Sequence, residues 1–309
     1  MTTGVLVMAY GTPESPDEIG AFYTDIRRGR PPTAAQLAEL RSRYAAIGGV
    51  SPLAQRTAAQ VAAIAKALDE EAPGHFRTAY GAKHSDPKIE VAVDRLADKG
   101  VSAIVGLVLA PHYSVASVGE YIERARTRAA ARGVAVAFVE RWGAESELVE
   151  LLAGRTAAAI ASLGRRPAPG IEVVFTAHSL PAWILSRGDR YPEEVAETAA
   201  LVAARLGLVR WRTGWQSAGR TEEPWLGPDI VETLGVIASE GARAVVVCAI
   251  GFTSDHLEVC YDLDVVAAAR AAELGLGFVR AASLNDDPRL AGLLARLAVA
   301  ADPDPGTRS

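Results

Sequence analysis

Short apolar runs alternate with longer amphipathic stretches along this chain of 309 residues. This alternation is typical of βαβ units, in which helices connect the parallel strands of one sheet. We predict strands over Val5–Ala9, Phe76–Gly81, Ser102–Ala110, Val134–Val139, Ile171–Thr176, Trp211–Gln216, Ala244–Ile250 and Leu276–Val279. Helices are predicted near residues 34–46, 52–70, 87–99, 116–131, 146–163, 193–206, 229–240, 257–273 and 288–301.

The predicted strands divide into two sets of four, separated by a stretch that includes the turn-rich segment 164–170. The halves also resemble each other, because the strands ending at Ala110 and Ile250 each lead into a polar loop with a histidine and then a helix. We therefore predict an α/β fold of two similar doubly wound, Rossmann-like lobes. Each would hold a four-stranded parallel sheet, with an active-site cleft between them. The expected lobes cover residues 1–145 and 146–309, with a frayed tail over 301–309.

Composition and charge exclude several classes of protein. Half of the residues are apolar, 22% are charged and the net charge is −5, which is ordinary for a folded soluble protein and disfavours nucleic acid as a partner. The longest uncharged stretch, residues 100–119, holds only about ten apolar residues before Pro111-His112, whereas a membrane span needs roughly 20. The N-terminus lacks the basic and apolar regions of a signal peptide. We expect a cytoplasmic monomer without a membrane span.

Ligands of open parallel sheets bind beyond the carboxyl ends of the strands. Three histidines and a glutamate follow predicted strands there: His112, His178, His256 and Glu258. We expect them to converge on one rim. No glycine-rich phosphate-binding fingerprint follows any of these strands, which disfavours a nucleotide-dependent enzyme.

The residues alone leave two interpretations of each candidate. His178 can be a structural histidine that bonds a loop carbonyl, or an imidazole kept neutral by apolar neighbours and able to bind a metal or accept a proton. Glu258 fits a capping box with Asp255. Glu258 and Asp262 lie four residues apart and would share a helical face, either as solvated surface or as a route for cations and protons.

Arginines gather between residues 27 and 43, where only Glu39 opposes them. Such a run is either a solvated face or a binding surface for carboxylates, which the guanidinium fork suits well. The neighbouring Tyr23 and Tyr44 make a flat ligand with several carboxylates a plausible partner. The arginines are Arg27, Arg28, Arg30, Arg41 and Arg43.

Five motifs, in this order, resemble those of the ferrochelatase family over essentially the whole chain. The resemblance implies a lyase that inserts ferrous iron into a porphyrin bound between two α/β lobes. It places His178 and Glu258 at the active site as the catalytic and metal-binding pair, with Asp262 on an accessory acidic path. The motifs are Val7-Met-Ala-Tyr-Gly-Thr-Pro13, Tyr44-Ala-Ala-Ile-Gly-Gly-Val-Ser-Pro-Leu53, Thr176-Ala-His-Ser-Leu-Pro181, Gly214-Trp-Gln-Ser-Ala-Gly219 with Pro224-Trp-Leu-Gly-Pro228, and Gly251-Phe-Thr-Ser-Asp-His-Leu-Glu258 with Tyr261-Asp262.

Tyr10 is similar to the tyrosine of the coproporphyrin-using enzymes of Gram-positive bacteria, where it approaches the iron of the product as an axial ligand. The resemblance therefore implies coproporphyrin III and Fe(II) as substrates and Fe-coproporphyrin III (coproheme) as product. A haem-pathway enzyme would receive that product. The porphyrin contacts that it implies are Tyr10, Arg27, Arg43, Tyr44, Ser51 and Tyr121.

Other functions remain open alongside this one. They are a protoporphyrin IX ferrochelatase, a chelatase for a more reduced tetrapyrrole, a non-catalytic porphyrin or haem carrier, and a periplasmic-type two-lobe binder. Actinobacterial relatives often carry a two-iron two-sulfur cluster on four cysteines, but this chain has only Cys248 and Cys260, so we expect no cluster and no other prosthetic group. Relatives often place another carboxylate one turn beyond Asp262, where this chain has Val266, which puts a second cation site in doubt.

Overall fold

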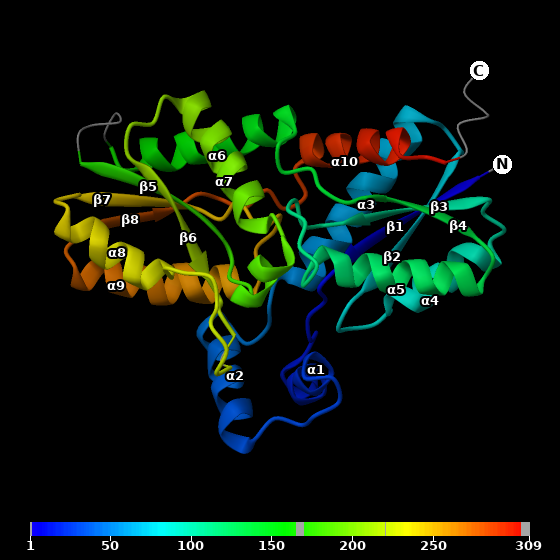
Figure 1. Ribbon diagram of the computed structural model, residues 1–309, viewed down its shortest axis with the longest axis horizontal. Helices are drawn as coiled ribbons and strands as arrows, with labels where there is room; N and C mark the ends of the chain where they lie inside the picture. Colours follow the sequence, from blue (N-terminus) through cyan, green and yellow to red (C-terminus); the bar gives the residue numbers. More distant parts are fainter. Residues whose placement is uncertain (1, 165–169, 220, 304–309) are drawn as a thin grey trace. The chain divides into compact units, whose positions relative to one another are not determined.

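The computed structural model describes residues 2–164, 170–219 and 221–303. Within these ranges the chain forms two compact units (Figure 1). Unit 1 consists of residues 2–110, 117–141 and 285–303, and unit 2 consists of residues 111–116 and the described part of 142–284. Each unit contains one four-stranded parallel sheet, as the sequence predicted.

The sheet of unit 1 has the strand order β2-β1-β3-β4. Its central strands, β1 (Thr3–Ala9) and β3 (Ala103–Val108), are buried along their whole length, whereas the edge strands β2 (Phe76–Ala82) and β4 (Ala135–Val139) are partly exposed. Helices on both faces explain why the central strands are almost uniformly apolar (Figure 1). The helices that contact this sheet are α3 (Leu53–Glu71), α4 (Ile89–Asp98), α5 (Val118–Ala131) and α10 (Pro288–Ala300). The unit also contains α1 (Ile19–Ile26), α2 (Ala34–Ala46) and a 3-10 turn η1 (Pro16–Glu18).

Helix α10 belongs to unit 1, whereas the sequence pattern placed it in the second lobe. It packs on α3 and on the sheet of unit 1, because an amphipathic helix docks on whichever apolar face fits it and chain order does not specify that face. Beyond the helix, the buried Asp302 carboxylate accepts a hydrogen bond from Thr3 Oγ1 (2.9 Å) and contacts His75 Nε2 (2.8 Å). The expected fraying therefore does not begin at residue 301, and residues 304–309 lie outside the described residues.

Unit 2 repeats this plan with the strand order β6-β5-β7-β8. In both sheets the strand that comes first in sequence lies inside, next to the second and third, so the predicted likeness of the halves is confirmed. The strands are β5 (Ile171–His178), β6 (Trp211–Gln216), β7 (Ala244–Cys248) and β8 (Gly277–Arg280). The helices are α6 (Ser146–Ser162), η2 (Ala182–Arg187), α7 (Tyr191–Leu206), α8 (Ile230–Ser239), η3 (Val259–Ala267) and α9 (Ala268–Glu273).

Two local features were not predicted. Helix α1 has eight residues and begins Ile-Gly, a window too short for an apolar period to stand out. The helix predicted over 257–273 starts with two α-helical residues, 257 and 258, is π-helical over η3 and returns to the α-helical form in α9. π-helical turns widen a helix locally and occur often at functional sites. This one begins directly after Glu258, one of the predicted site residues.

Candidate functional site

His178 is the last residue of β5, at the carboxyl end of an inner strand. About one third of its side chain is exposed (33%), and the Tyr191 hydroxyl donates to its backbone carbonyl (2.9 Å). Its Nδ1 atom is inaccessible to solvent yet makes no hydrogen bond to any described residue. The imidazole therefore does not hold a described loop carbonyl through Nδ1, and the Glu258 carboxylate lies 3.4 Å away at Oε2.

Gly251 allows the loop after β7 to reach this position. Its backbone N–H bonds the Thr176 carbonyl (3.1 Å), so the loop crosses directly beside β5. A Cβ at residue 251 would stand 2.6 Å from the Cβ of Ala177, closer than real side chains approach. Only glycine fits this crossing, which brings residues 254–258 alongside the end of β5.

The Glu258 carboxylate lies between two imidazoles. Its Oε2 atom is 3.4 Å from His178 Nδ1 and 3.5 Å from His256 Nε2. His256 Nδ1 lies 3.1 Å from the Ser254 carbonyl, and a carbonyl can only accept, so this nitrogen carries the proton. In neutral His256 the lone pair is then on Nε2, facing Glu258. A carboxylate and a nitrogen lone pair thus meet at one point, where they can take up protons or attract a cation.

The Asp255 carboxylate, the other half of the predicted capping box, accepts hydrogen bonds from Arg280 Nη1 (3.0 Å) and Ser283 Oγ (2.8 Å). The capping box itself stays a prediction. The Glu258 side chain is 35% exposed and is directed at the two imidazoles.

Two polar side chains at the end of β6 position the acidic residues, and the sequence analysis gave them no role. The Gln216 amide donates to the Glu258 carbonyl (3.3 Å) while its own oxygen accepts from Thr176 Oγ1 (2.9 Å). The Ser217 hydroxyl donates to the Asp262 carboxylate. Glu258 and Asp262 therefore have different partners. Gln216 and Ser217 belong to the Gly-Trp-Gln-Ser motif, which marks them in the sequence, but only the fold shows what their side chains contact.

His112 does not join the other two histidines, contrary to expectation. It is 2% exposed, and its Nε2 atom lies 2.9 Å from Thr198 Oγ1. Burial lowers its pKa to about 3, so the ring stays neutral in the folded protein. It belongs to segment 111–116, which Ser114 ties to unit 2 through a hydrogen bond to Asp189 (2.9 Å).

Tyr10, the candidate in unit 1 at the end of β1, is 40% exposed. Its ring stands 4.7 Å from the ring of His84, which Asp25 holds through a 2.8 Å contact to Nδ1. Lys88 donates to the other oxygen of the Asp25 carboxylate (2.8 Å). Burial lowers the pKa of His84. No motif in the sequence pointed to Asp25, His84 or Lys88.

The predicted arginine cluster divides into separate local contacts. Arg43 pairs with Glu39 (2.8 Å) and Arg28 with Glu120 (3.6 Å), whereas the Arg27 guanidinium donates to the Arg30 carbonyl (3.2 Å). Arg27 also lies 5.7 Å from the Tyr23 ring centroid.

The remaining predicted porphyrin contacts are buried side chains. Tyr44 is 3% exposed, and Ser51 and Tyr121 are each 6% exposed. The Ser51 hydroxyl accepts from the Leu53 N–H (3.2 Å), and Lys83 Nζ lies 5.2 Å from the centre of the Tyr121 ring. Burial raises the pKa of Tyr121, so its hydroxyl stays protonated. A ligand could therefore contact only the small exposed part of each of these three side chains.

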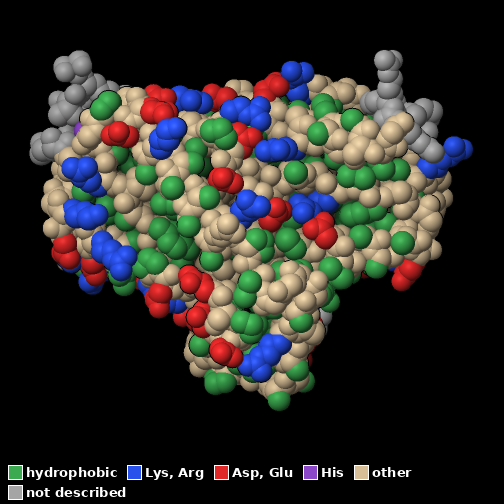
Figure 2. Space-filling view, turned by 180° about the vertical axis from the view of Figure 1, so that it is seen from behind, with side chains coloured by type: hydrophobic (Ala, Val, Ile, Leu, Met, Phe, Trp, Pro, Cys, Tyr) green, Lys and Arg blue, Asp and Glu red, His purple; other side chains and the backbone are tan. Residues whose placement is uncertain are grey.

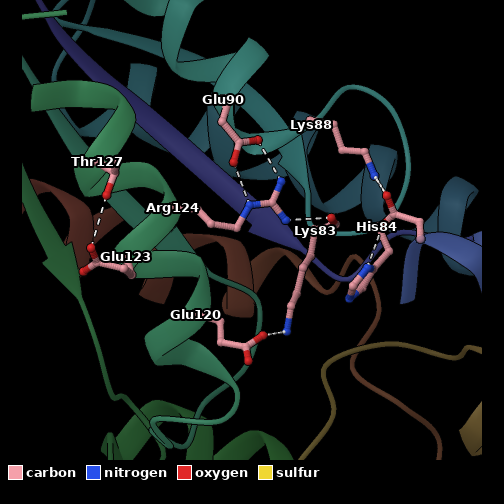
Figure 3. Close-up of polar contacts among 9 residues, drawn as sticks. Lys83, His84, Lys88, Glu90, Glu120, Glu123, Arg124 and Thr127 are labelled. Atoms are coloured by element: carbon pink, nitrogen blue, oxygen red, sulfur yellow. Dashed lines mark hydrogen bonds and ion pairs between the residues drawn. The ribbon is translucent and has the colours of Figure 1, made fainter. Parts of the chain in front are cut away.

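Charges of both signs are interspersed on the described surface. Between α4 and α5, Arg124 pairs with Glu90 (2.7 Å) and Arg128 with Asp94 (2.7 Å), the first of which is drawn in Figure 3. Figure 2 shows the same alternation of acidic and basic side chains over the face that it presents. No helix in the described part of the chain is long and apolar enough to cross a membrane. Nor does any group of three or more His, Cys, Asp or Glu side chains among the described residues form a ready metal-binding set.

The sequence profile of the family named Ferrochelatase matches residues 2–301. The chain belongs to the ferrochelatase family. It is 44% identical over 302 residues to the ferrochelatase of Thermus thermophilus, covering 92% of this chain and 94% of the relative. It is also 40% identical over 297 residues to the coproporphyrin III ferrochelatase of Geobacillus kaustophilus, covering 95% of this chain and 94% of the relative. The resemblance drawn from the five motifs is confirmed.

Solved chelatase structures share the fold. The sirohydrochlorin chelatase SirB from Bacillus subtilis matches with a TM-score of 0.60 over 100% of this chain and 98% of its own, at 12% identity. CbiX, described as the terminal enzyme of sirohaem biosynthesis in denitrifying bacteria, matches with a TM-score of 0.56 over 97% and 99%, at 16% identity. The predicted α/β class with two four-stranded parallel sheets is confirmed.

Proposed function

We propose that this ferrochelatase inserts Fe(II) into coproporphyrin III to form coproheme. The reaction exchanges two pyrrole protons for one ferrous ion, so the enzyme needs groups that accept protons and tolerate a passing dication. The observation that carries the proposal is the Glu258 carboxylate between His178 and His256. The relatives named coproporphyrin III ferrochelatase support the choice of porphyrin.

We assign His178 and Glu258 as the catalytic pair that meets the metal and the pyrrole protons. Both side chains are about one third exposed, so substrate can reach them while part of each group is shielded from water. Partial shielding strengthens their electrostatic interaction with a cation. The Asp262 carboxylate, held by Ser217, would carry protons or iron along the neighbouring helix.

The porphyrin carboxylates are proposed to bind the arginines of unit 1. Coproporphyrin III bears four propionates, and Arg27 and Arg43 present guanidinium groups suited to them. Tyr44, Ser51 and Tyr121 would border the ring, and the exposed Tyr10 would approach the iron of the product. Protoporphyrin IX, with two propionates, remains the alternative substrate.

We expect no prosthetic group, with Fe(II) acting only as substrate. Burial raises the pKa of both Cys248 and Cys260 to about 11, so neither thiol readily gives the thiolate that an iron–sulfur cluster requires. The purified protein should therefore show no visible absorption from a cluster. We further propose a cytoplasmic monomer whose product passes to a haem-pathway enzyme.

The test is anaerobic Fe(II) insertion into coproporphyrin III and protoporphyrin IX side by side, followed by the loss of porphyrin fluorescence. A large preference in kcat/KM for coproporphyrin III supports the proposal. Preference for protoporphyrin IX would keep the chemistry but refute the substrate. Tight binding of both porphyrins without insertion would favour a porphyrin carrier instead.

A further inference from the structure

Unit 1 contains a cavity of about 460 Å³ beside its edge strand β2. One wall is the face of α3 that runs from Leu53 to Ala65, and the opposite wall is Thr78 and Tyr80 of β2. The loops after β1 and β2, residues 11–14 and 85–87, lie against each other and close the cavity at the carboxyl ends of these strands. Pockets that bind small ligands have volumes of this order, roughly 300–1,000 Å³.

Glycine at position 11 allows the two closing loops to meet. Its φ angle is +86°, a conformation that side chains rarely adopt. A Cβ there would also overlap the Ser85 side chain. The contact between these loops is therefore built into the sequence, and it closes one end of the cavity.

Thr57 supplies an unsatisfied polar group on the cavity wall. Its side chain is 2% exposed, yet Oγ1 has no hydrogen-bond partner among the described residues. Buried threonines inside a helix commonly bond the carbonyl four residues earlier. Thr156 and Thr233 do so here, at 2.8 and 2.6 Å. An unpaired buried hydroxyl destabilises the folded protein, and a bound ligand that bonds this hydroxyl would remove that cost.

The charged groups of the cavity have one sign. Glu14 and Asp86, both exposed, lie on its two closing loops, and no Lys, Arg or His is among the described residues that line it. The wall formed by α3 is mostly alanine, with Leu53 and Val61 as its larger apolar side chains. Tyr80 stays a neutral phenol, because burial raises its pKa to about 12. A porphyrin with several propionates would be repelled here, so the cavity suits a ligand other than the substrate.

We propose that this cavity binds a small organic cation, an apolar body with one protonated amine. The body would lie along the alanine and valine face of α3, with the ammonium toward Glu14 and Asp86. Thr57 Oγ1 would supply a directional hydrogen bond. The site is independent of the porphyrin chemistry proposed above, because none of its lining residues is assigned to that reaction.

Three probes of nearly equal size test the charge preference: phenethylammonium, 2-phenylethanol and phenylacetate. Calorimetric or NMR titration of the intact protein at low ionic strength should give a dissociation constant of about 0.1–1 mM for the cation. The alcohol should bind about 5-fold more weakly and the acid at least about 10-fold more weakly. Equal or tighter binding of the acid, or no saturation by the cation at 10 mM, would overturn the proposal.

Variants locate the binding. Ala62→Phe projects a ring from the exposed cavity face of α3. It should lower the affinity for the cation at least about 10-fold, because the new ring occupies the space that the apolar body of the cation would fill. Ala130→Phe, on an exposed face of α5, adds the same ring elsewhere and should leave affinity unchanged. If both variants retain full affinity, the cation binds outside this cavity and the proposal fails.

Thr57→Val gives a second, independent readout. Loss of the hydroxyl should lower the affinity for the cation about 5-fold, because the hydrogen bond to the cation is lost. It should also raise the melting temperature of the ligand-free protein, because the unpaired buried hydroxyl is gone. A stable variant with unchanged affinity would remove Thr57 from the site and contradict the proposed hydrogen bond. Iron insertion by each variant, measured separately, reports on the porphyrin site alone.

Discussion

His178 Nδ1 lies 3.4 Å from Glu258 Oε2, and this buried nitrogen makes no hydrogen bond to any residue that the structure describes. The two groups are close enough to exchange a proton after a small movement. A tight ion pair between them would compete with the porphyrin and with the metal.

We expect His178→Ala to abolish iron insertion while coproporphyrin III still binds. In our proposal the imidazole serves the chemistry of the metal and the protons, whereas Arg27 and Arg43 bind the propionates. Anaerobic turnover and quenching of porphyrin fluorescence separate the two effects. Glu258→Gln, which keeps the size of the side chain but not its charge, should lose at least about 100-fold in kcat. Near-normal turnover by either variant would remove that residue from the catalytic pair.

Asp25 is expected to position Tyr10 through His84. Asp25→Asn loses the charge that holds both His84 and Lys88, which frees the His84 ring that packs on Tyr10. We expect kcat to fall about 5- to 10-fold, the equivalent of one well-placed hydrogen bond. Porphyrin affinity should change less than about 2-fold, since Asp25 bears no propionate-binding role.

The matched control for this prediction is Asp94→Asn. Asp94 also binds cationic side chains in unit 1, Arg128 and Arg132, but it has no described contact with His84. Tyrosine ring NMR signals, assigned with Tyr10→Phe, should shift in Asp25→Asn and not in the control. Equal effects of the two variants would show a general loss of stability rather than positioning.

Arg27→Ala should weaken coproporphyrin III binding by about 1–3 kcal/mol, the range for a lost charge-assisted hydrogen bond. The loss should shrink at high salt, because Arg27 is partly exposed and its interaction is screened. Fluorescence titration at two ionic strengths measures both effects. Arg95→Ala, at an exposed position of α4 outside the arginine cluster, serves as the control. Unchanged affinity in Arg27→Ala would take this residue out of the site.

His112 should make unit 2 less stable in acid. Burial lowers its pKa in the folded state to about 3, below the ordinary 6.5, so below pH 6.5 only the unfolded chain takes up the proton. The free energy of unfolding then rises with pH across the window from 3 to 6.5. When the pH is lowered from 7 to 5, this histidine reduces the free energy of unfolding by about 2 kcal/mol.

Tryptophan fluorescence during urea unfolding measures this effect in unit 2, because all five tryptophans lie there. His112→Gln keeps a group that can bond Thr198 but does not titrate. The difference in unfolding free energy between wild type and variant should change by about 2 kcal/mol between pH 7 and pH 5, whatever its value at pH 7. Parallel stability curves would mean that His112 titrates normally in the folded state.

The sequence by itself determined the fold class, the strands and the family. Strand patterns are local, so apolar runs such as those of β1 and β7 can be recognised as strands from a few consecutive residues. Motifs are local too, which is why His178 and Glu258 could be named without coordinates. The carboxyl-end rule then placed both residues on the correct edge of a sheet.

Only the tertiary structure decided which side chains meet. The sequence placed His112 with the other histidines, but packing buried it against Thr198. It placed α10 in the second lobe, yet the helix docks on α3 of unit 1. Gln216 contacts the backbone at Glu258, 42 residues along the chain, because β5 and β6 pair in register and η3 begins beside them. Contacts over such separations depend on how sheets and helices pack, which no local pattern of residues encodes.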